Sequence, residues 1–235
     1  MAHLAITYVL ALSCSLVPQT RALALGSRDH FDRCHLGSMA HFELNGKTIG
    51  LIGGLGAIGT RVGAIARALG MHPIASSRSA PPGMRDDGVE VANDLPDLLR
   101  RSDFVSIHCP LNDDTRHLLD AQAIGHMKRT AYVVNTARGA IIHEAALVDA
   151  LQSRRIAGAA LDVCGESAAP PPPPPADSPL YALDNVILTP HIGWQRLETR
   201  QRIVSAVAEN VAAFARGEPQ NVVNSEVWAW DCAQP

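Results

Sequence analysis

The sequence has few aromatic residues, no excess of positive charge and no regular cysteine pattern. Phe, Trp and Tyr make up 4% of the 235 residues, so Ala, Val, Leu and Ile must form most of any core. The formal net charge is −3, which gives no electrostatic reason to expect nucleic acid as a partner. The five cysteines contain no CxxC pair, which argues against a disulfide framework or a zinc site and is typical of a reducing compartment such as the cytoplasm.

An apolar segment, residues 4–17, lies near the start of the chain. It is too short to span a bilayer, which takes about 20 residues. No Lys or Arg precedes it and the first cation is Arg21, which argues against a secretory signal peptide ending near Ala24. We expect a buried helix, Leu4–Leu16, that stops before Pro18 and does not cross a membrane. A secreted protein cleaved before Leu25 is the alternative.

From residue 43 onward, short apolar strands alternate with helices. The spacing predicts strands at 48–52, 74–76, 104–108, 131–134, 156–163 and 186–189. Helices are expected at about 62–69, 95–101, 121–127, 144–152 and 198–216. Apolar strands that alternate with helices are typical of a parallel sheet covered on both faces. The predicted fold class is therefore α/β, a doubly wound parallel sheet.

A glycine-rich turn follows the first strand. Gly54, Gly56 and Gly59 form a G-x-G-x-x-G pattern between that strand and an amphipathic helix. The glycines permit a tight turn and let backbone N–H groups approach a pyrophosphate at the helix N-terminus. The pattern in this context predicts a dinucleotide site, and a glycine-rich turn without a ligand is the alternative.

The end of the second strand bears on the choice of cofactor. An acidic residue about 20 positions after the fingerprint usually holds the ribose 2′-hydroxyl, and none stands here. Ser77 has no charge to repel a 2′-phosphate and Arg78 is able to pair with one, which favours NADP over NAD. An ordinary solvated role for Arg78 is the alternative.

Two further segments follow strands, and each holds a residue suited to 2-oxo acid chemistry. Arg138 has a planar guanidinium that binds a carboxylate with two hydrogen bonds and keeps its charge. His191 has a side chain that exchanges protons near neutral pH. Their positions after strands make them the candidate catalytic residues.

These motifs, in this order, resemble the D-isomer-specific 2-hydroxyacid dehydrogenases over about residues 5–224. The resemblance is carried by Glu43–Thr48, the glycine fingerprint, His108–Leu111, Asn135–Gly139, Ala160–Val163 and Thr189–Gly193. Trp194, with residues 199–202 and 220–224, is most similar to the glycerate dehydrogenase (hydroxypyruvate reductase) branch.

The resemblance implies a Rossmann-type domain with flanking hinge helices and a hydride transfer between NAD(P)H and a small 2-oxo acid, hydroxypyruvate or glyoxylate. It implies that Arg138 binds the substrate carboxylate and carbonyl, that His191 is the acid and base, and that Asp162 hydrogen-bonds the nicotinamide end. Arg138 and His191 are also expected to contact the cofactor, and the further residues expected to line it are Ala57, Ile58, Cys109, Pro110, Thr136, Ala137 and Gly193. A cytoplasmic homodimer without a metal is expected. Transcriptional corepressors of the same fold share these motifs, so a non-enzymatic NAD(P)-binding protein is the alternative.

The sequence departs from the family pattern in the glycine turn and after Asp162. Gly53 is one glycine more than the usual spacing, which would disturb the turn. Ser167 stands where the family has its catalytic glutamate, so Glu166 is the candidate substitute if the loop shifts. A proline run, Pro170–Pro175, then expands the loop at 165–179. A tolerated loop expansion explains the run better than an SH3-type ligand does, because no basic residue flanks it.

The resemblance also divides the chain into residues 1–36, 37–193 and 194–235: a hinge helix with the remnant of the substrate-domain connection, the NAD(P)-binding domain, and a C-terminal helix with its tail. The family's substrate-binding half normally precedes the hinge helix, and its absence suggests a fragment, a splice product or a decayed copy. We therefore expect nucleotide binding with little turnover and an exposed apolar surface on the helix at 4–16, unless a second chain completes the cleft.

Overall fold

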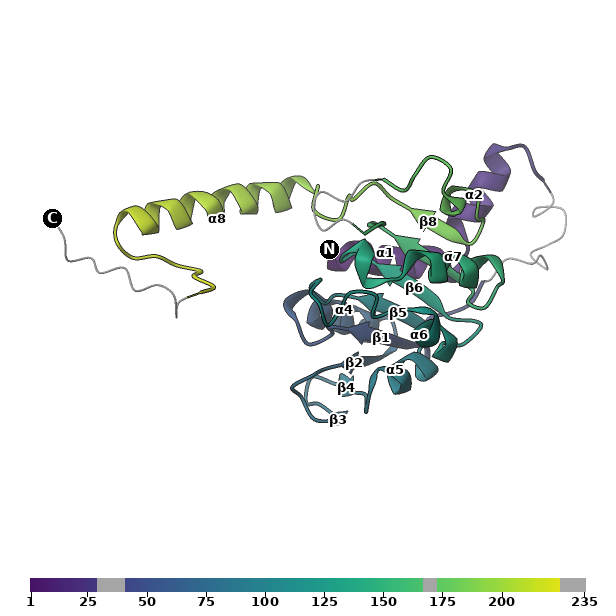
Figure 1. Cartoon of the computed structure of the whole chain (residues 1–235), viewed down its shortest axis with the longest axis horizontal. Helices are drawn as coiled ribbons and strands as arrows, with labels where there is room; N and C mark the ends of the chain where they lie inside the picture. The colour runs from purple at the N-terminus through teal and green to yellow at the C-terminus, as the bar shows by residue number, and fades with distance from the viewer. Residues whose placement is uncertain (29–40, 167–172, 225–235) are drawn as a thin grey trace. The chain divides into compact units, whose positions relative to one another are not determined.

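The computed structural model describes residues 1–28, 41–166 and 173–224. The chain divides into two compact units, Met1–Gly193 and Trp194–Pro235, and each is described by itself. The sheet and the helices around it all belong to the first unit (Figure 1).

One sheet of eight strands, in the order β3-β4-β2-β1-β5-β6-β7-β8, forms the centre of the first unit. The strands are β1 (Thr48–Ile52), β2 (His72–Ser76), β3 (Gly83–Met84), β4 (Glu90–Val91), β5 (Phe104–Ile107), β6 (Tyr132–Asn135), β7 (Gly158–Leu161) and β8 (Val186–Leu188). All neighbouring pairs are parallel except β3 with β4. The strand order reverses between β1 and β5, which is where a doubly wound sheet binds its ligands.

Helices cover both faces of this sheet (Figure 1). The α-helices of the first unit are α1 (Ala2–Ser13), α2 (Leu16–Ala24), α4 (Ala57–Ala68), α5 (Leu95–Arg101), α6 (Ala121–His126) and α7 (Glu144–Gln152), with 3₁₀ turns η1 (Gly139–Ile141) and η2 (Pro179–Tyr181). Residues of α5, α6 and α7 share one apolar core cluster, and those of α1 and α4 share another. The predicted doubly wound α/β fold is confirmed.

The predicted elements with strong apolar patterns match the structure closely. The helices at 95–101 and 144–152 and the strand at 48–52 have the expected bounds. The strand expected at 156–163 is shorter, because the ordered pairing of β7 with its neighbours covers only Gly158–Leu161. Strands β3 and β4 are not predicted by the sequence, since strands of two residues carry no periodic pattern.

The first helix differs from the expectation in its surroundings and in its end. The expected exposed apolar surface is wrong for most of the helix, because α1 packs on α4 and on β6 and buries Leu4, Ala5 and Val9, while Leu10 is 44% exposed. The helix stops at Ser13, and Ser15, with φ of 48°, turns the chain into α2. Pro18 therefore does not end a helix but lies in the first turn of α2, where its missing N–H is not needed.

In the described part of the chain, no single helix has the length and apolarity needed to cross a membrane. Only α1 and α2 taken together satisfy that test, and they are bent by 65° relative to each other.

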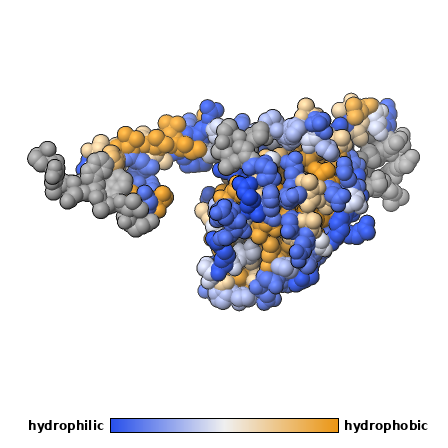
Figure 2. Space-filling view, in the orientation of Figure 1, coloured by the Kyte–Doolittle hydropathy of each residue, from blue (hydrophilic) through white to orange (hydrophobic). Residues whose placement is uncertain are grey.

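The second unit contains α8 (Leu197–Ala215). Its apolar residues Val204, Val207, Val211 and Phe214 recur at three- and four-residue spacing, so they share one side of the helix. Figure 2 shows hydrophobic atoms along this helix.

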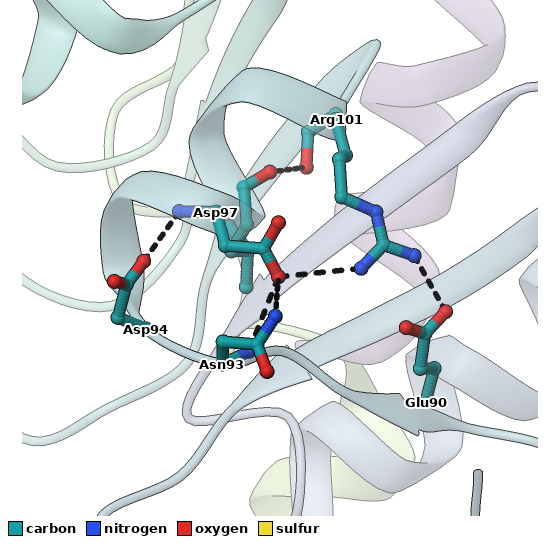
Figure 3. A network of polar contacts seen from close by, with 7 residues as sticks. Glu90, Asn93, Asp94, Asp97 and Arg101 are labelled. Atoms are coloured by element: carbon teal, nitrogen blue, oxygen red, sulfur yellow. Dashed lines mark hydrogen bonds and ion pairs between the residues drawn. The ribbon is translucent and has the colours of Figure 1, made fainter. Parts of the chain in front are cut away.

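A polar network fixes α5 against the edge of the sheet (Figure 3). Asp94 caps the helix by accepting a hydrogen bond of 2.6 Å from the backbone N–H of Asp97. Arg101 donates to Glu90 of β4 at 2.6 Å and to Asp97 at 3.3 Å. These bonds hold the first residue of α5, Leu95, at the wall of the cavity described below.

Candidate functional site

The turn after β1 accommodates its additional glycine. Gly53 has φ of 79°, in the left-handed region that L-residues with side chains avoid. A Cβ added there would lie 2.6 Å from the backbone nitrogen of Cys109. Gly53 therefore lets the turn pass close to the chain that leaves β5, and α4 begins directly after Gly56.

The other glycines leave room for a ligand over the start of α4. A Cβ on Gly59 would lie 2.5 Å from the Cα of Gly54, so the helix packs closely on the turn. A Cβ on Gly56, by contrast, would have Gly53 O at 3.5 Å as its nearest contact, so the space over Gly56 is open. No side chain caps this helix and no acidic residue stands in its first turn. An uncapped N-terminus of this kind suits a pyrophosphate.

A cavity of about 470 Å³ opens beside this turn, between the ends of β2 and β5. It brings together five residues predicted to contact the cofactor: Gly56, Ser77, Arg78, Cys109 and Pro110. Ala57, Ile58 and Gly59 lie next to it in the first turn of α4. This volume lies at the point where the strand order reverses.

The polar groups of the β2 end are already engaged. The Ser77 hydroxyl oxygen accepts the backbone N–H of Ala80 at 2.9 Å. Arg78 Nη1 lies 2.6 Å from Asp114 Oδ2, and both side chains are exposed to solvent. Asp114 is not predicted as a site residue, since nothing near it in the chain indicates a partner 36 residues away.

The β5 end contributes a neutral histidine and a protonated thiol. His108 Nε2 lies 2.9 Å from the Ser106 hydroxyl, and burial lowers the pKa of His108 to about 4. Burial raises the pKa of the Cys109 thiol. At neutral pH both side chains are therefore uncharged, so they add no repulsion to a bound anion.

Residues after β6 form a compact turn around Arg138. The side-chain amide of Asn135 donates to Arg138 O at 2.8 Å, and its oxygen accepts the Ala137 N–H at 3.0 Å. The guanidinium of Arg138 donates to Ala137 O at 2.7 Å and is partly buried. Thr136 lies between these residues and is 2% exposed. Asn135 thereby sets the direction in which Arg138 leaves the sheet.

The segment after β8 holds His191 in a strained backbone conformation. His191 has φ of 55°, which is uncommon for a residue other than glycine. Its N–H bonds to Asp162 O at 3.1 Å. The Asp162 carboxylate, only 2% exposed, accepts the N–H groups of Ile192 at 2.8 Å and Gly193 at 2.9 Å. Asp162 thus fixes the loop that carries His191.

Tyr8 of α1, which was not among the predicted site residues, supports the same loop. Its hydroxyl lies 3.5 Å from Asp162 Oδ1 and forms a hydrogen bond with the Thr189 hydroxyl. Burial raises the pKa of Tyr8, so the hydroxyl keeps its proton. A tyrosine in a largely apolar helix is the signal that would have drawn attention to it.

Glu166, the candidate substitute for the family's glutamate, points to other partners. Its carboxylate lies 3.1 Å from Arg116 Nη1 and 2.9 Å from His117 Nε2. No described contact joins it to His191. Ser167 and part of the proline run lie outside the described residues.

A second cavity of about 430 Å³ lies against Asp162 and His191. Pro173 and Pro174, at the end of the proline run, form part of its wall, and Tyr181 donates a hydrogen bond to Pro174 O at 3.1 Å. Cys164 also borders it, and burial with the nearby charges of Glu144 and Asp162 raises the pKa of this thiol to about 12. In the described residues no group of three or more His, Cys, Asp or Glu side chains is placed to hold a metal ion.

Comparison with known families agrees with this geometry. Residues 6–193 match the family described as D-isomer specific 2-hydroxyacid dehydrogenase, NAD binding domain. The chain belongs to this family.

Individual relatives carry several enzyme names. A glyoxylate reductase of Aeropyrum pernix is 46% identical over 190 residues, which are 80% of this chain and 55% of that protein. A glycerate dehydrogenase of Methylorubrum extorquens is 33% identical over 215 residues, 92% of this chain and 65% of the relative. An acyclic imino acid reductase solved with NADPH and D-Arg superimposes with a TM-score of 0.80 at 30% identity, covering 94% of this chain and 66% of that structure. The chain spans about half the length of the glyoxylate reductase.

Proposed function

We propose that this chain is the dinucleotide-binding part of an oxidoreductase that transfers a hydride between NAD(P)H and a small 2-oxo or 2-hydroxy acid. The observation that carries the proposal is the cavity at the β1–β5 reversal, where Gly56, Ser77, Arg78, Cys109 and Pro110 meet. The family match supports the same conclusion.

The residues around the turn suit each part of the cofactor. The open space over Gly56 and the uncapped start of α4 accept the pyrophosphate. Ser77 and Arg78 stand where the adenosine ribose is held, and the apolar walls beside Leu95 and Cys109 take the adenine. The nicotinamide end of the cofactor lies against residues that follow β6, β7 and β8: Thr136, Ala137, Asp162 and Gly193.

When bound, the nicotinamide supplies the hydride that reduces the carbonyl carbon. Arg138 binds the substrate carboxylate and polarises the carbonyl, since its planar fork matches a carboxylate. His191 donates a proton to the carbonyl oxygen as the hydride arrives, and takes it back in the reverse direction.

Asp162 acts as a positioning residue in this scheme. Its carboxylate already accepts the two backbone N–H groups that follow His191, at 2.8 and 2.9 Å. Proton transfer requires the donor to point at the carbonyl oxygen within narrow limits of distance and direction. Because Asp162 fixes the loop, it positions the His191 side chain for this transfer.

Hydroxypyruvate and glyoxylate are the substrates we propose, because the relatives include a glyoxylate reductase and a glycerate dehydrogenase. A homodimer in the cytoplasm remains the expectation for the assembly. The second candidate is a non-enzymatic NAD(P)-binding protein, which the pairing of Glu166 with Arg116 and His117 favours.

Two measurements on the purified chain test these functions. Titration with NADPH and NADH, followed by nicotinamide fluorescence, should saturate; the absence of binding to both would refute a dinucleotide-binding role. Assays with hydroxypyruvate and glyoxylate then separate the candidates. Turnover of about 1–10³ per second is ordinary enzyme activity, whereas binding without turnover supports the non-enzymatic protein.

A further inference from the structure

Two opposite charges face each other inside the cofactor cavity. Arg78 stands at the end of β2 and Asp114 in the segment after β5, and both line the cavity. Arg78 Nη1 lies 2.6 Å from Asp114 Oδ2. Among the described residues that line this cavity, these two alone carry a full charge at neutral pH, since His108 is neutral there. Any anionic group of a ligand near Arg78 therefore meets Asp114 as well.

The chain holds Asp114 in place more firmly than it holds Arg78. Asn112 accepts the Thr115 N–H at 3.1 Å on its side-chain oxygen, and its own N–H donates to the Thr115 hydroxyl at 2.9 Å. The Thr115 hydroxyl donates to Pro110 O at 2.7 Å. Both side chains are exposed, Arg78 at 78% and Asp114 at 69%, but Asp114 has a short side chain on this closed turn, whereas the guanidinium of Arg78 is at the end of a long side chain. The arginine is thus the mobile partner.

We propose that Asp114 is a specificity-determining residue that competes with a ribose 2′-phosphate for Arg78. A guanidinium pairs with a carboxylate and with a phosphate through the same N–H groups. A 2′-phosphorylated nucleotide must therefore draw Arg78 away from Asp114, while a nucleotide with a free 2′-hydroxyl leaves the pair intact. The inference rests on the proposed dinucleotide site and adds which residue limits its preference for NADP(H) over NAD(H).

The effect of Asp114 on the affinity for a 2′-phosphate is small, because the ion pair is exposed. Both side chains are more than two-thirds open to solvent, where water screens the attraction. Removing Asp114 should therefore strengthen binding of a 2′-phosphate by about fivefold, the factor that corresponds to the upper range for an exposed pair.

The test uses two probes that differ at the 2′ position: adenosine 2′,5′-bisphosphate and 5′-AMP. Calorimetric titrations at one fixed salt concentration compare the parent chain with Asp114→Asn, Arg78→Ala and the double variant. Asp113→Asn is the matched control, because it removes the neighbouring carboxylate, which does not line the cavity. We expect Asp114→Asn to tighten the bisphosphate about fivefold and to change 5′-AMP by less than about twofold. In the Arg78→Ala background the gain should fall below about twofold, since no cation is left to compete for.

Three results would overturn the proposal. Unchanged binding of the bisphosphate by Asp114→Asn would mean that Asp114 does not compete for Arg78, and weaker binding would mean that Asp114 prepares Arg78 for the phosphate. An equal gain with and without Arg78, or with Asp113→Asn, would mean general charge repulsion. Failure of the parent chain to bind either probe, NADPH or NADH would refute the proposed function as well, and is distinguished by appearing before any substitution is made.

Discussion

The segments that follow β1, β2 and β5 differ in construction from those that follow β7 and β8, although all of them lie at the carboxyl-end edge of the sheet. Around β1, β2 and β5, the backbone itself shapes the site: glycines keep the turn open, and the start of α4 has no side-chain cap. After β7 and β8, carboxylate side chains hold the chain in place: Asp162 accepts two backbone N–H groups of the loop that carries His191, and Glu166 pairs with the side chains of Arg116 and His117.

This difference indicates which function tolerates change. A dinucleotide is held largely by backbone N–H groups, so the site persists when surrounding side chains differ. Proton transfer needs particular side chains at particular distances, so one displaced carboxylate is enough to weaken it. In the sequence, the departures from the family pattern at Ser167 and in the proline run come shortly after Asp162.

The largest effect should follow from His191→Ala. In any assay in which the parent chain turns over hydroxypyruvate, this change should lower kcat by about 10²–10⁴-fold, the usual contribution of an acid–base group. Arg138→Lys should also lower kcat/KM strongly, because an ammonium cannot form the two parallel bonds. NADPH affinity should stay within about twofold for both. Parental steady-state rates for either variant would show that the catalytic end has been placed wrongly.

Asp162→Ala should have the next largest effect, and it tests whether that carboxylate supports the His191 loop. The change leaves the buried N–H group of Gly193 and that of Ile192 without acceptors, so the free energy of unfolding should fall by about 2–4 kcal/mol. Urea denaturation measures this. Asp184→Ala is the control, because that carboxylate is 72% exposed and its loss should cost less than about 1 kcal/mol. Equal losses for the two variants would contradict the role of Asp162.

The stability of the chain at acid pH tests the surroundings of His108, which follows β5 at the other end of this edge of the sheet. Because burial lowers the pKa of His108 from 6.5 to about 4, the unfolded chain binds more protons between these pH values. This residue therefore leaves stability unchanged above about pH 6.5 and lowers it by up to about 3 kcal/mol as the pH falls to 4. His108→Gln should flatten this part of the stability profile, measured by urea denaturation at each pH. A profile that His108→Gln leaves unaltered would mean that His108 is solvated in the folded chain.

Arg78→Ala should produce the smallest effect and distinguish the two cofactors. We expect NADPH binding to weaken by about 1–3 kcal/mol, the range for a charge-assisted hydrogen bond, and NADH binding to change less. Titrations with both nucleotides measure the difference. Equal losses for NADPH and NADH would remove the argument for a 2′-phosphate at Arg78.

Much of the fold was predictable because it depends on local patterns. Apolar runs and helical spacing predicted β1, α5 and α7 with their bounds, and the glycine pattern predicted the turn. The contacts that assemble the site join residues far apart in the chain. Tyr8 meets Asp162 across 154 residues, and Arg78 meets Asp114 across 36. Neither contact leaves a periodic trace in the sequence, because it depends on how whole elements pack rather than on neighbouring residues.

The partners of the Glu166 carboxylate could not be predicted from the sequence for the same reason. Glu166 stands one residue before the position of the family's glutamate, which makes it the candidate substitute if the loop shifts, while its partners Arg116 and His117 come from a segment about 50 residues earlier. The packing of α1 is a second case. Its apolar residues predicted burial, but only the fold shows that they pack on the chain's own sheet.

The central claim is that the backbone turn after β1 holds a dinucleotide, and one titration tests it directly. Gly56→Ala adds a methyl group that meets nothing closer than 3.5 Å in the chain and projects into the open space over the turn. Gly125→Ala is the matched control, since a Cβ there meets nothing within 4 Å and lies on α6. With both variants folded, shown by unchanged circular dichroism and urea midpoints no lower than that of the parent, we expect Gly56→Ala to weaken NADPH and NADH binding at least about tenfold and Gly125→Ala to leave both unchanged. Parental affinity in Gly56→Ala would contradict the claim.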